Sequence, residues 1–191
     1  MIKKLLGSIR EYKKDSILAP IYVTLEVVLE VLIPYLMSMI IDKGIGEGDM
    51  PFIIRIGLIL IVSTLFSLGF GVLSGLHAAK ASAGFAKNIR KDMYYNIQDF
   101  SFSNIDQFST SSLITRLTTD ITNVQNSFQM IIRIMVRAPL MLVFSLLMAL
   151  NINSELGMVF LGAIPFLGLG LYLIMSKAFP IFQKVFRTYD K

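Results

Sequence analysis

The sequence has 191 residues, of which 54% are hydrophobic and 16% are charged, and its formal net charge is +5. This leaves too little polar surface to cover a soluble core, so lipid is expected to solvate much of the chain. There is no cysteine and one histidine, which excludes disulfides, cysteine nucleophiles and metal sites built on several imidazoles. The basic residues flank apolar segments, so the charge indicates membrane topology rather than nucleic-acid binding.

Four apolar segments come close to or exceed the roughly 20 helical residues that cross a bilayer core of about 30 Å. They cover residues 16–41, 51–79, 134–150 and 156–178. Residues 1–15 carry apolar side chains at helical spacing with basic residues between them, which predicts a short elbow helix in the membrane interface. A frayed basic leader is the alternative. The expected fold class is therefore all-α, a polytopic membrane protein with four transmembrane helices.

The lysines and arginines predict the orientation of these helices. Of the 18 basic residues, all but Lys43 and Arg55 lie in or beside the two terminal segments and residues 80–133. Because basic residues favour the cytoplasmic side of a membrane, both termini are predicted to be cytoplasmic in a multi-pass protein of the cell membrane.

Residues 80–133 are too polar for lipid but keep a helical period. Apolar residues recur every three or four positions on both sides of a polar stretch at 101–112, which is rich in turn-forming and helix-capping residues. A helix from Pro51 to Gln98 would be about 72 Å long, so some 40 Å would extend beyond the membrane. The sequence predicts a helical hairpin in the cytoplasm with its tip exposed to a partner. A self-contained hairpin without a partner is the alternative.

Ionisable residues within the spans are candidates for function. Glu26 and Glu30 share one helix face, and carboxylates at that depth are costly unless they meet water, a cation or another helix. They either line a cargo cavity that favours a cationic substrate or make polar contacts with a neighbouring helix. Arg133 and Arg137 form a similar pair at the entry of the third span, where snorkelling accounts for them and a charge link to the glutamates is the alternative. His77 is expected to be a packing or interfacial residue.

The hairpin carries a specific resemblance. The runs Ile105-Asp106-Gln107-Phe108, Ser112-Leu113-Ile114-Thr115-Arg116-Leu117-Thr118-Thr119-Asp120 and Val124-Gln125 resemble the first intracellular loop of exporter-type ATP-binding cassette (ABC) transporters. The elbow, the short outer loop and the deep start of the third span are similar too, so the resemblance covers essentially the whole chain. It implies half of a six-helix transmembrane domain, which in this family is followed by a nucleotide-binding domain. The sequence is therefore expected to be a truncated N-terminal half.

The resemblance also implies roles for residues at the hairpin tip. A short coupling helix, which touches the nucleotide-binding domain in this family, would be formed by Ser109, Thr110, Ser111, Ser112, Leu113 and Ile114. Arg116 and Asp120 would support it from the helix that follows. The family commonly has glycine where this chain has Ser111 and Ser112, which leaves the start of the coupling helix open.

The partners and cofactors follow from the same resemblance. They are the lipid bilayer, a second half-transporter subunit, identical or different, and a nucleotide-binding domain that carries ATP and Mg²⁺. These 191 residues contain no Gly-x-x-x-x-Gly-Lys-Ser/Thr loop, so no catalytic residue and no cofactor are expected in this chain. The alternatives are a stand-alone four-span proton-coupled transporter with Glu26 as the proton carrier, and a membrane scaffold whose hairpin binds a soluble protein.

Overall fold

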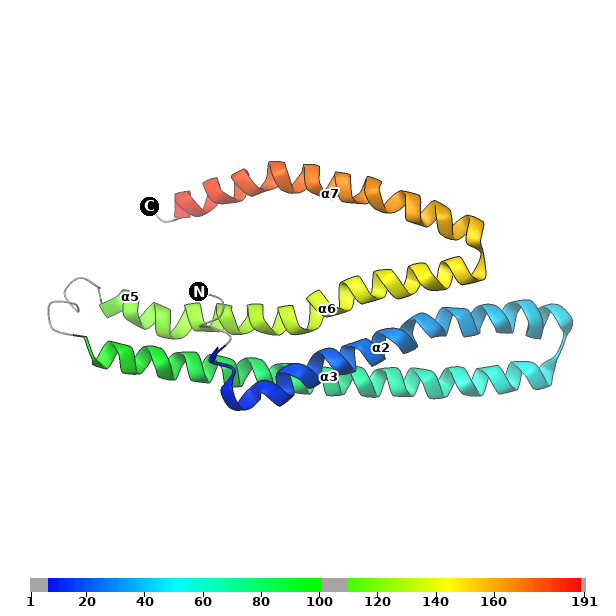
Figure 1. Ribbon diagram of the computed structural model, residues 1–191, viewed down its shortest axis with the longest axis horizontal. Coiled ribbons are helices and arrows are strands. Elements are labelled where there is room, and N and C mark those ends of the chain that lie inside the picture. Colours follow the sequence, from blue (N-terminus) through cyan, green and yellow to red (C-terminus); the bar gives the residue numbers. More distant parts are fainter. Residues whose placement is uncertain (1–6, 101–109, 190–191) are drawn as a thin grey trace. The chain divides into compact units, whose positions relative to one another are not determined.

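The computed structural model describes the backbone of residues 7–100 and 110–189 and the side chains of residues 7–100 and 111–178. These parts of the chain are helical and contain no strand (Figure 1). The chain divides into two compact units, residues 1–142 and 143–191. Four helices are long and apolar enough to cross a membrane, which confirms the predicted all-α fold with four spans.

The first span is helix α2 (Lys13–Met39), which ends in a π-helical segment, η2 (Ile40–Ile45). A short 3₁₀ turn, η1 (Arg10–Tyr12), precedes it. Arg10 has a φ of 41°, in the left-handed region that non-glycine residues seldom adopt, and this interrupts the helix predicted for residues 1–15. Residues 1–6 of that predicted elbow lie outside the described residues.

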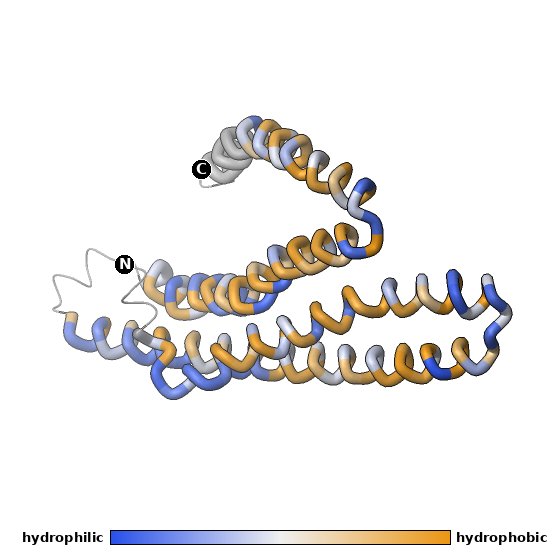
Figure 2. The backbone as a smooth tube through the Cα atoms, turned by 45° about the vertical axis from the view of Figure 1, so that its right-hand side comes forward, coloured by the Kyte–Doolittle hydropathy of each residue, from blue (hydrophilic) through white to orange (hydrophobic). Residues whose placement is uncertain are grey.

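Helix α3 (Met50–Gln98) is the longest element, with 49 residues and a length of about 73 Å. Its start is defined by Asp49, whose carboxylate accepts a hydrogen bond from the Phe52 backbone N at 3.1 Å. Gly48 has a φ of 70° and provides the turn that reverses the chain before it. Figure 2 shows hydrophobic residues along the first part of α3 and hydrophilic residues toward its C-terminal end. One helix thus continues from an apolar segment into a polar one, with the predicted end at Gln98.

Small side chains let α2 and α3 approach closely. Ala19 on α2 and Ser74, Ala78 and Ala81 on α3 are fully buried. The Ser74 hydroxyl donates a hydrogen bond to the Ala19 carbonyl at 3.2 Å, so the contact is polar as well as tightly packed. Membrane helices commonly associate through such small residues, because these allow the backbones to come together.

The return arm of the hairpin consists of α5 (Thr110–Thr115), the π-helical turn η3 (Arg116–Asp120) and α6 (Ile121–Ile152). These follow one another without interruption, and Figure 1 shows α5 and the first part of α6 running beside the second half of α3. Phe85 of α3 stacks on Phe128 of α6 with ring centroids 4.4 Å apart, and both rings are buried. Arg90 Nε donates a hydrogen bond to the Leu117 carbonyl at 3.1 Å. The predicted hairpin therefore consists of two packed antiparallel helical arms.

The second unit contains the end of α6 and helix α7 (Ser154–Tyr189). Asn153 joins the two helices, and its side-chain oxygen accepts hydrogen bonds from the backbone N of Glu155 at 3.0 Å and of Leu156 at 3.2 Å. It caps α7 in the way that asparagine commonly caps a helix. Most of the described side chains of α7 are apolar and exposed, as expected for a helix solvated by lipid or by further helices.

Candidate functional site

An ion cluster links α2 to α6 inside the first unit. Arg137 Nη1 donates to Glu26 Oε1 at 2.6 Å, and Arg137 Nη2 donates to Glu30 Oε2 at 2.7 Å and to Glu30 Oε1 at 3.0 Å. The Glu26 side chain is 12% exposed, whereas those of Arg137 and Glu30 are 34% and 36% exposed. One guanidinium therefore binds both carboxylates, and its planar fork suits such bridging.

Two glycines of α3 provide room beside this cluster. A Cβ atom at Gly71 would lie 3.1 Å from Glu26 Oε1, and one at Gly75 would lie 3.8 Å from Arg133 Nη1. These two glycines thus leave room on α3 for charged side chains from α2 and α6. Within the described residues, Glu26 Oε2 is buried without a hydrogen-bond partner, and Arg133 makes no hydrogen bond or ion pair.

The sequence leaves two roles open for Glu26 and Glu30, lining a cargo cavity or contacting a neighbouring helix, and the ion cluster bears on both. The structure brings Glu26, Glu30 and Arg137 together, and it places Arg133 beside Gly75 without joining it to them. Both carboxylates already have a cationic partner, so the contact between helices has a direct structural basis. A cation from cargo would have to compete with Arg137 for them.

A second buried carboxylate lies near the start of α2. Asp15 is 8% exposed, and its Oδ1 accepts a hydrogen bond from His77 Nδ1 at 2.7 Å. Lys80 Nζ lies 3.6 Å from Asp15 Oδ2, and the Tyr22 ring stacks on His77 with centroids 5.5 Å apart. His77 is therefore both a packing residue and the partner of a carboxylate. The sequence gives no signal for this pairing, because Asp15 and His77 are far apart along the chain.

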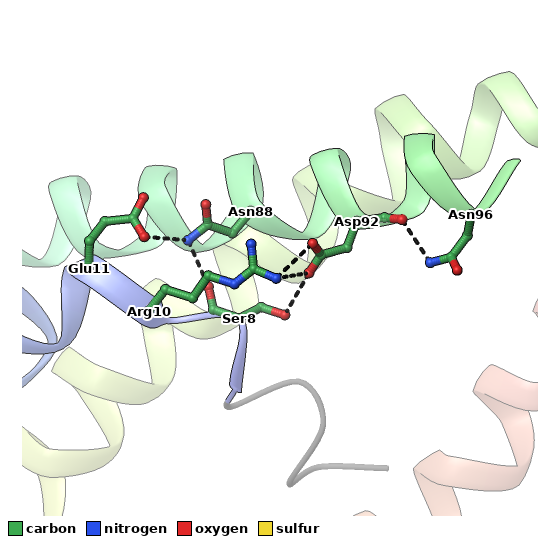
Figure 3. A network of polar contacts seen from close by, with 6 residues as sticks. All are labelled: Ser8, Arg10, Glu11, Asn88, Asp92 and Asn96. Carbon is green, nitrogen blue, oxygen red and sulfur yellow. Dashed lines mark hydrogen bonds and ion pairs between the residues drawn. The ribbon is translucent and has the colours of Figure 1, made fainter. Parts of the chain in front are cut away.

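A polar network fastens the N-terminal segment to α3 (Figure 3). Arg10 Nη2 donates to Asp92 Oδ1 at 2.9 Å and to Asp92 Oδ2 at 3.1 Å. Asn88 is 3% exposed and donates to the Ser8 carbonyl at 2.9 Å. The Tyr12 ring packs against Gly84, where a Cβ atom would collide with it. These contacts explain why Arg10 adopts its unusual backbone angle, and sequence patterns did not reveal them.

The predicted coupling residues lie at the start of the return arm. Thr110 to Ile114 fall within α5, and Ser109 lies outside the described residues. Ile114 is 57% exposed, and Arg116 and Asp120 are also exposed, in η3. Leu113 faces the end of α3, where it helps to line a hollow of about 140 Å³. The other residues that line this hollow are Met93, Asn96, Ile97, Phe100 and Arg116.

Comparison with known proteins decides the family. The family model described as the ABC transporter transmembrane region matches residues 16–191. The chain belongs to this family. The resemblance to exporter-type ABC transporters is thereby confirmed, and the match includes the hairpin as well as the four spans.

Curated relatives of this ABC transporter transmembrane region agree with the assignment. The uncharacterised ABC transporter ATP-binding protein YfiB of Bacillus subtilis is 36% identical over 190 residues, which are 100% of this chain and 33% of the relative. An uncharacterised ABC transporter ATP-binding protein of Mycobacterium tuberculosis is 27% identical, over 93% of this chain and 30% of its own length. An ATP-dependent lipid A-core flippase of Pseudoalteromonas translucida is 24% identical over 93% of this chain and 30% of its own length. The chain spans about a third of the length of the curated relatives it matches.

Proposed function

We propose that this chain forms part of the translocation pathway of an ATP-driven exporter and supplies the first coupling loop to its nucleotide-binding domain. The observation that carries this proposal is the packed hairpin. Its arms are joined by the Phe85–Phe128 stack, and α3 is longer than a membrane crossing requires by about 40 Å. A rigid pair of helices can transmit a displacement at its tip to the spans from which it extends.

The exposed side chain of Ile114 is the contact point that we assign to the partner domain. It lies beside Leu113, but Leu113 packs toward α3, whereas Ile114 is exposed. An exposed large apolar residue at a helix start suits insertion into a groove of another domain. The predicted supporting residues Arg116 and Asp120 lie about half a turn and one and a half turns further along, where they would flank that contact.

ATP and Mg²⁺ belong to the partner domain in this proposal. The described residues contain no group of three or more His, Cys, Asp and Glu side chains that could hold a metal ion, and the 191 residues contain no phosphate-binding loop. A second half-transporter, identical or different, would complete the pathway, with both termini in the cytoplasm as the basic residues predict.

The test replaces Ile114 with Asp in the complete transporter reconstituted in lipid vesicles. Loss of one central apolar contact is expected to lower the ATP hydrolysis rate about tenfold. Thr119→Asp, on an exposed residue of η3, is the matched control and should change the rate by less than about twofold. An unchanged rate in the Ile114 variant would contradict the coupling role, and transport driven by a pH gradient without ATP would favour the proton-coupled alternative.

A further inference from the structure

Helices α2 and α6 present charge pairs with the same spacing. Glu26 and Glu30 are four residues apart on α2, and Arg133 and Arg137 are four residues apart on α6. Both helices run antiparallel to α3 and therefore parallel to each other (Figure 1). Each pair spans about 6 Å along its helix axis, so two carboxylates face two guanidinium groups at matching intervals.

The observed arrangement does not use this match fully. Arg137 binds both glutamates, so the two arginines and the two glutamates do not form two separate ion pairs. Arg133 has no polar partner within the described residues, and the second oxygen of Glu26 is buried and unpaired. The Arg133 guanidinium on α6 and one Glu26 oxygen on α2 thus remain without a polar partner among the described residues.

Helix α3 leaves a path between these two unused groups. Glu26 lies against Gly71 and Arg133 lies near Gly75, and these glycines are one turn apart on the same face of α3. No Cβ atom projects from either position. The side chains of Glu26 and Arg133 can therefore move along this surface without crossing a branched residue.

We propose that Glu26 is shared between two arginines in turn, and that this exchange sets two alternative registers of α6 along α2. In the observed register Arg137 binds both glutamates. When α6 slides by about 3 Å, half a helical turn, Arg133 binds Glu26 while Arg137 keeps Glu30. Neither register leaves a carboxylate without a cation, whereas positions between them weaken the Glu26 contact in an apolar environment. The cluster is therefore a two-position device, and it does not depend on the coupling role of the hairpin tip.

A distance measurement tests the exchange. The 191 residues contain no cysteine, so spin labels can be attached at Met37→Cys on α2 and Met130→Cys on α6, both at exposed positions. These two positions lie far apart along the helix axes, so a slide of α6 along α2 changes the distance between the labels by nearly the length of the slide. The distance distribution is measured by double electron–electron resonance in the complete transporter in lipid nanodiscs. Arg137→Lys retains the charge but cannot bridge two carboxylates with a planar fork, so it is expected to shift the main distance by about 3 Å.

Two further variants decide whether Arg133 causes that shift. Arg133→Gln should keep the distance of the unsubstituted pair, because it removes only the alternative partner. The combination of Arg133→Gln with Arg137→Lys should lose the shift seen with Arg137→Lys alone. The proposal is overturned if Arg137→Lys leaves the distance unchanged, if Arg133→Gln alone shifts it, or if the shift persists without Arg133.

Discussion

At the scale of single residues, the Glu26 carboxylate lies between an arginine that binds it and a glycine that leaves room for it. Its carboxylate contacts Arg137 and lies against Gly71 of α3. Breaking a buried ion pair typically costs about 3–5 kcal/mol, because the remaining charge loses its compensation. Glu26 is far less exposed than Glu30, so most of this cost is expected at Glu26.

Gly71→Leu should therefore destabilise the transmembrane domain, because the new side chain would occupy the space of the Glu26 carboxylate. The expected loss is about 3 kcal/mol, measured as the free energy of unfolding in mixed detergent micelles. Gly69→Leu is the matched control, since a Cβ atom there meets nothing within 4 Å and the position is exposed. Equal losses in the two variants would show that the recess for Glu26 contributes nothing specific.

The sequence predicts which helix faces carry these charged residues, but not all of their partners. Spacing alone places Glu26 and Glu30 on one side of a helix and raises a link to the arginine pair only as an alternative. That Arg137 binds both glutamates, while Arg133 binds neither, depends on the axial position of α6 beside α2. The pairing of Asp15 with His77 was not predicted at all, because no periodicity relates residues on different helices.

At the scale of the elements, the hairpin arms are held together by a cluster of buried apolar side chains, and an aromatic stack contributes its two largest members. The buried stack of Phe85 on Phe128 lies among the buried residues Ile89, Ile121 and Ile132. Toward the tip, Arg90 adds a hydrogen bond to the Leu117 carbonyl. Stiffness of the hairpin should therefore depend strongly on single aromatic residues.

Phe128→Ala is expected to separate the arms. Removal of a buried phenylalanine ring typically costs about 3–5 kcal/mol, and hydrogen exchange at residues 85–97 should become correspondingly faster. Met130→Ala, two positions away at a side chain that is 57% exposed, should change the exchange rates little. If the two variants behaved alike, the stack would not be what joins the arms.

The N-terminal segment provides a second prediction at this scale. Asp92→Ala removes the acceptor for Arg10, so trypsin should cleave after Lys13 or Lys14 about two- to fivefold faster, the range expected for an exposed ion pair. Asp99→Ala serves as the control, because Asp99 is exposed on the same arm and its carboxylate has no hydrogen bond or ion pair among the residues described. Unchanged cleavage in the Asp92 variant would mean that the network in Figure 3 does not restrain the segment.

Helical periodicity predicted most elements well, and the exceptions have identifiable causes. The 3.6-residue pattern extended past the membrane in residues 80–98, and α3 follows it to Gln98. The same pattern predicted a helix over residues 1–15, but among residues 7–12 the backbone turns at Arg10 so that this side chain can reach Asp92. A contact with a distant helix thus overrides the local preference.

At the scale of the whole molecule, the charge distribution predicts the orientation of the chain in the membrane, and this prediction can be tested directly. Glu47→Cys, at an exposed site between α2 and α3, should react with a membrane-impermeant maleimide in intact cells. Thr119→Cys, exposed at the start of the return arm, should react only after permeabilisation. The absence of native cysteine removes background labelling from this part of the protein. The reverse pattern would place the hairpin outside the cell and contradict the proposed function.

The unbroken course of α3 has a consequence for how this protein family can change in length. One residue inserted after Ser82 would rotate the rest of the helix by about 100°, so Phe85 would no longer point toward Phe128. Insertions or deletions of seven residues nearly restore the rotational phase, because seven residues make about two turns. Seven residues also shift the rest of the helix by about 10 Å along its axis, so the return arm must change by the same amount to keep Phe85 beside Phe128. Lengthening or shortening of the hairpin should therefore be tolerated in steps of two helical turns made in both arms, which sets the distances at which a partner domain can be engaged.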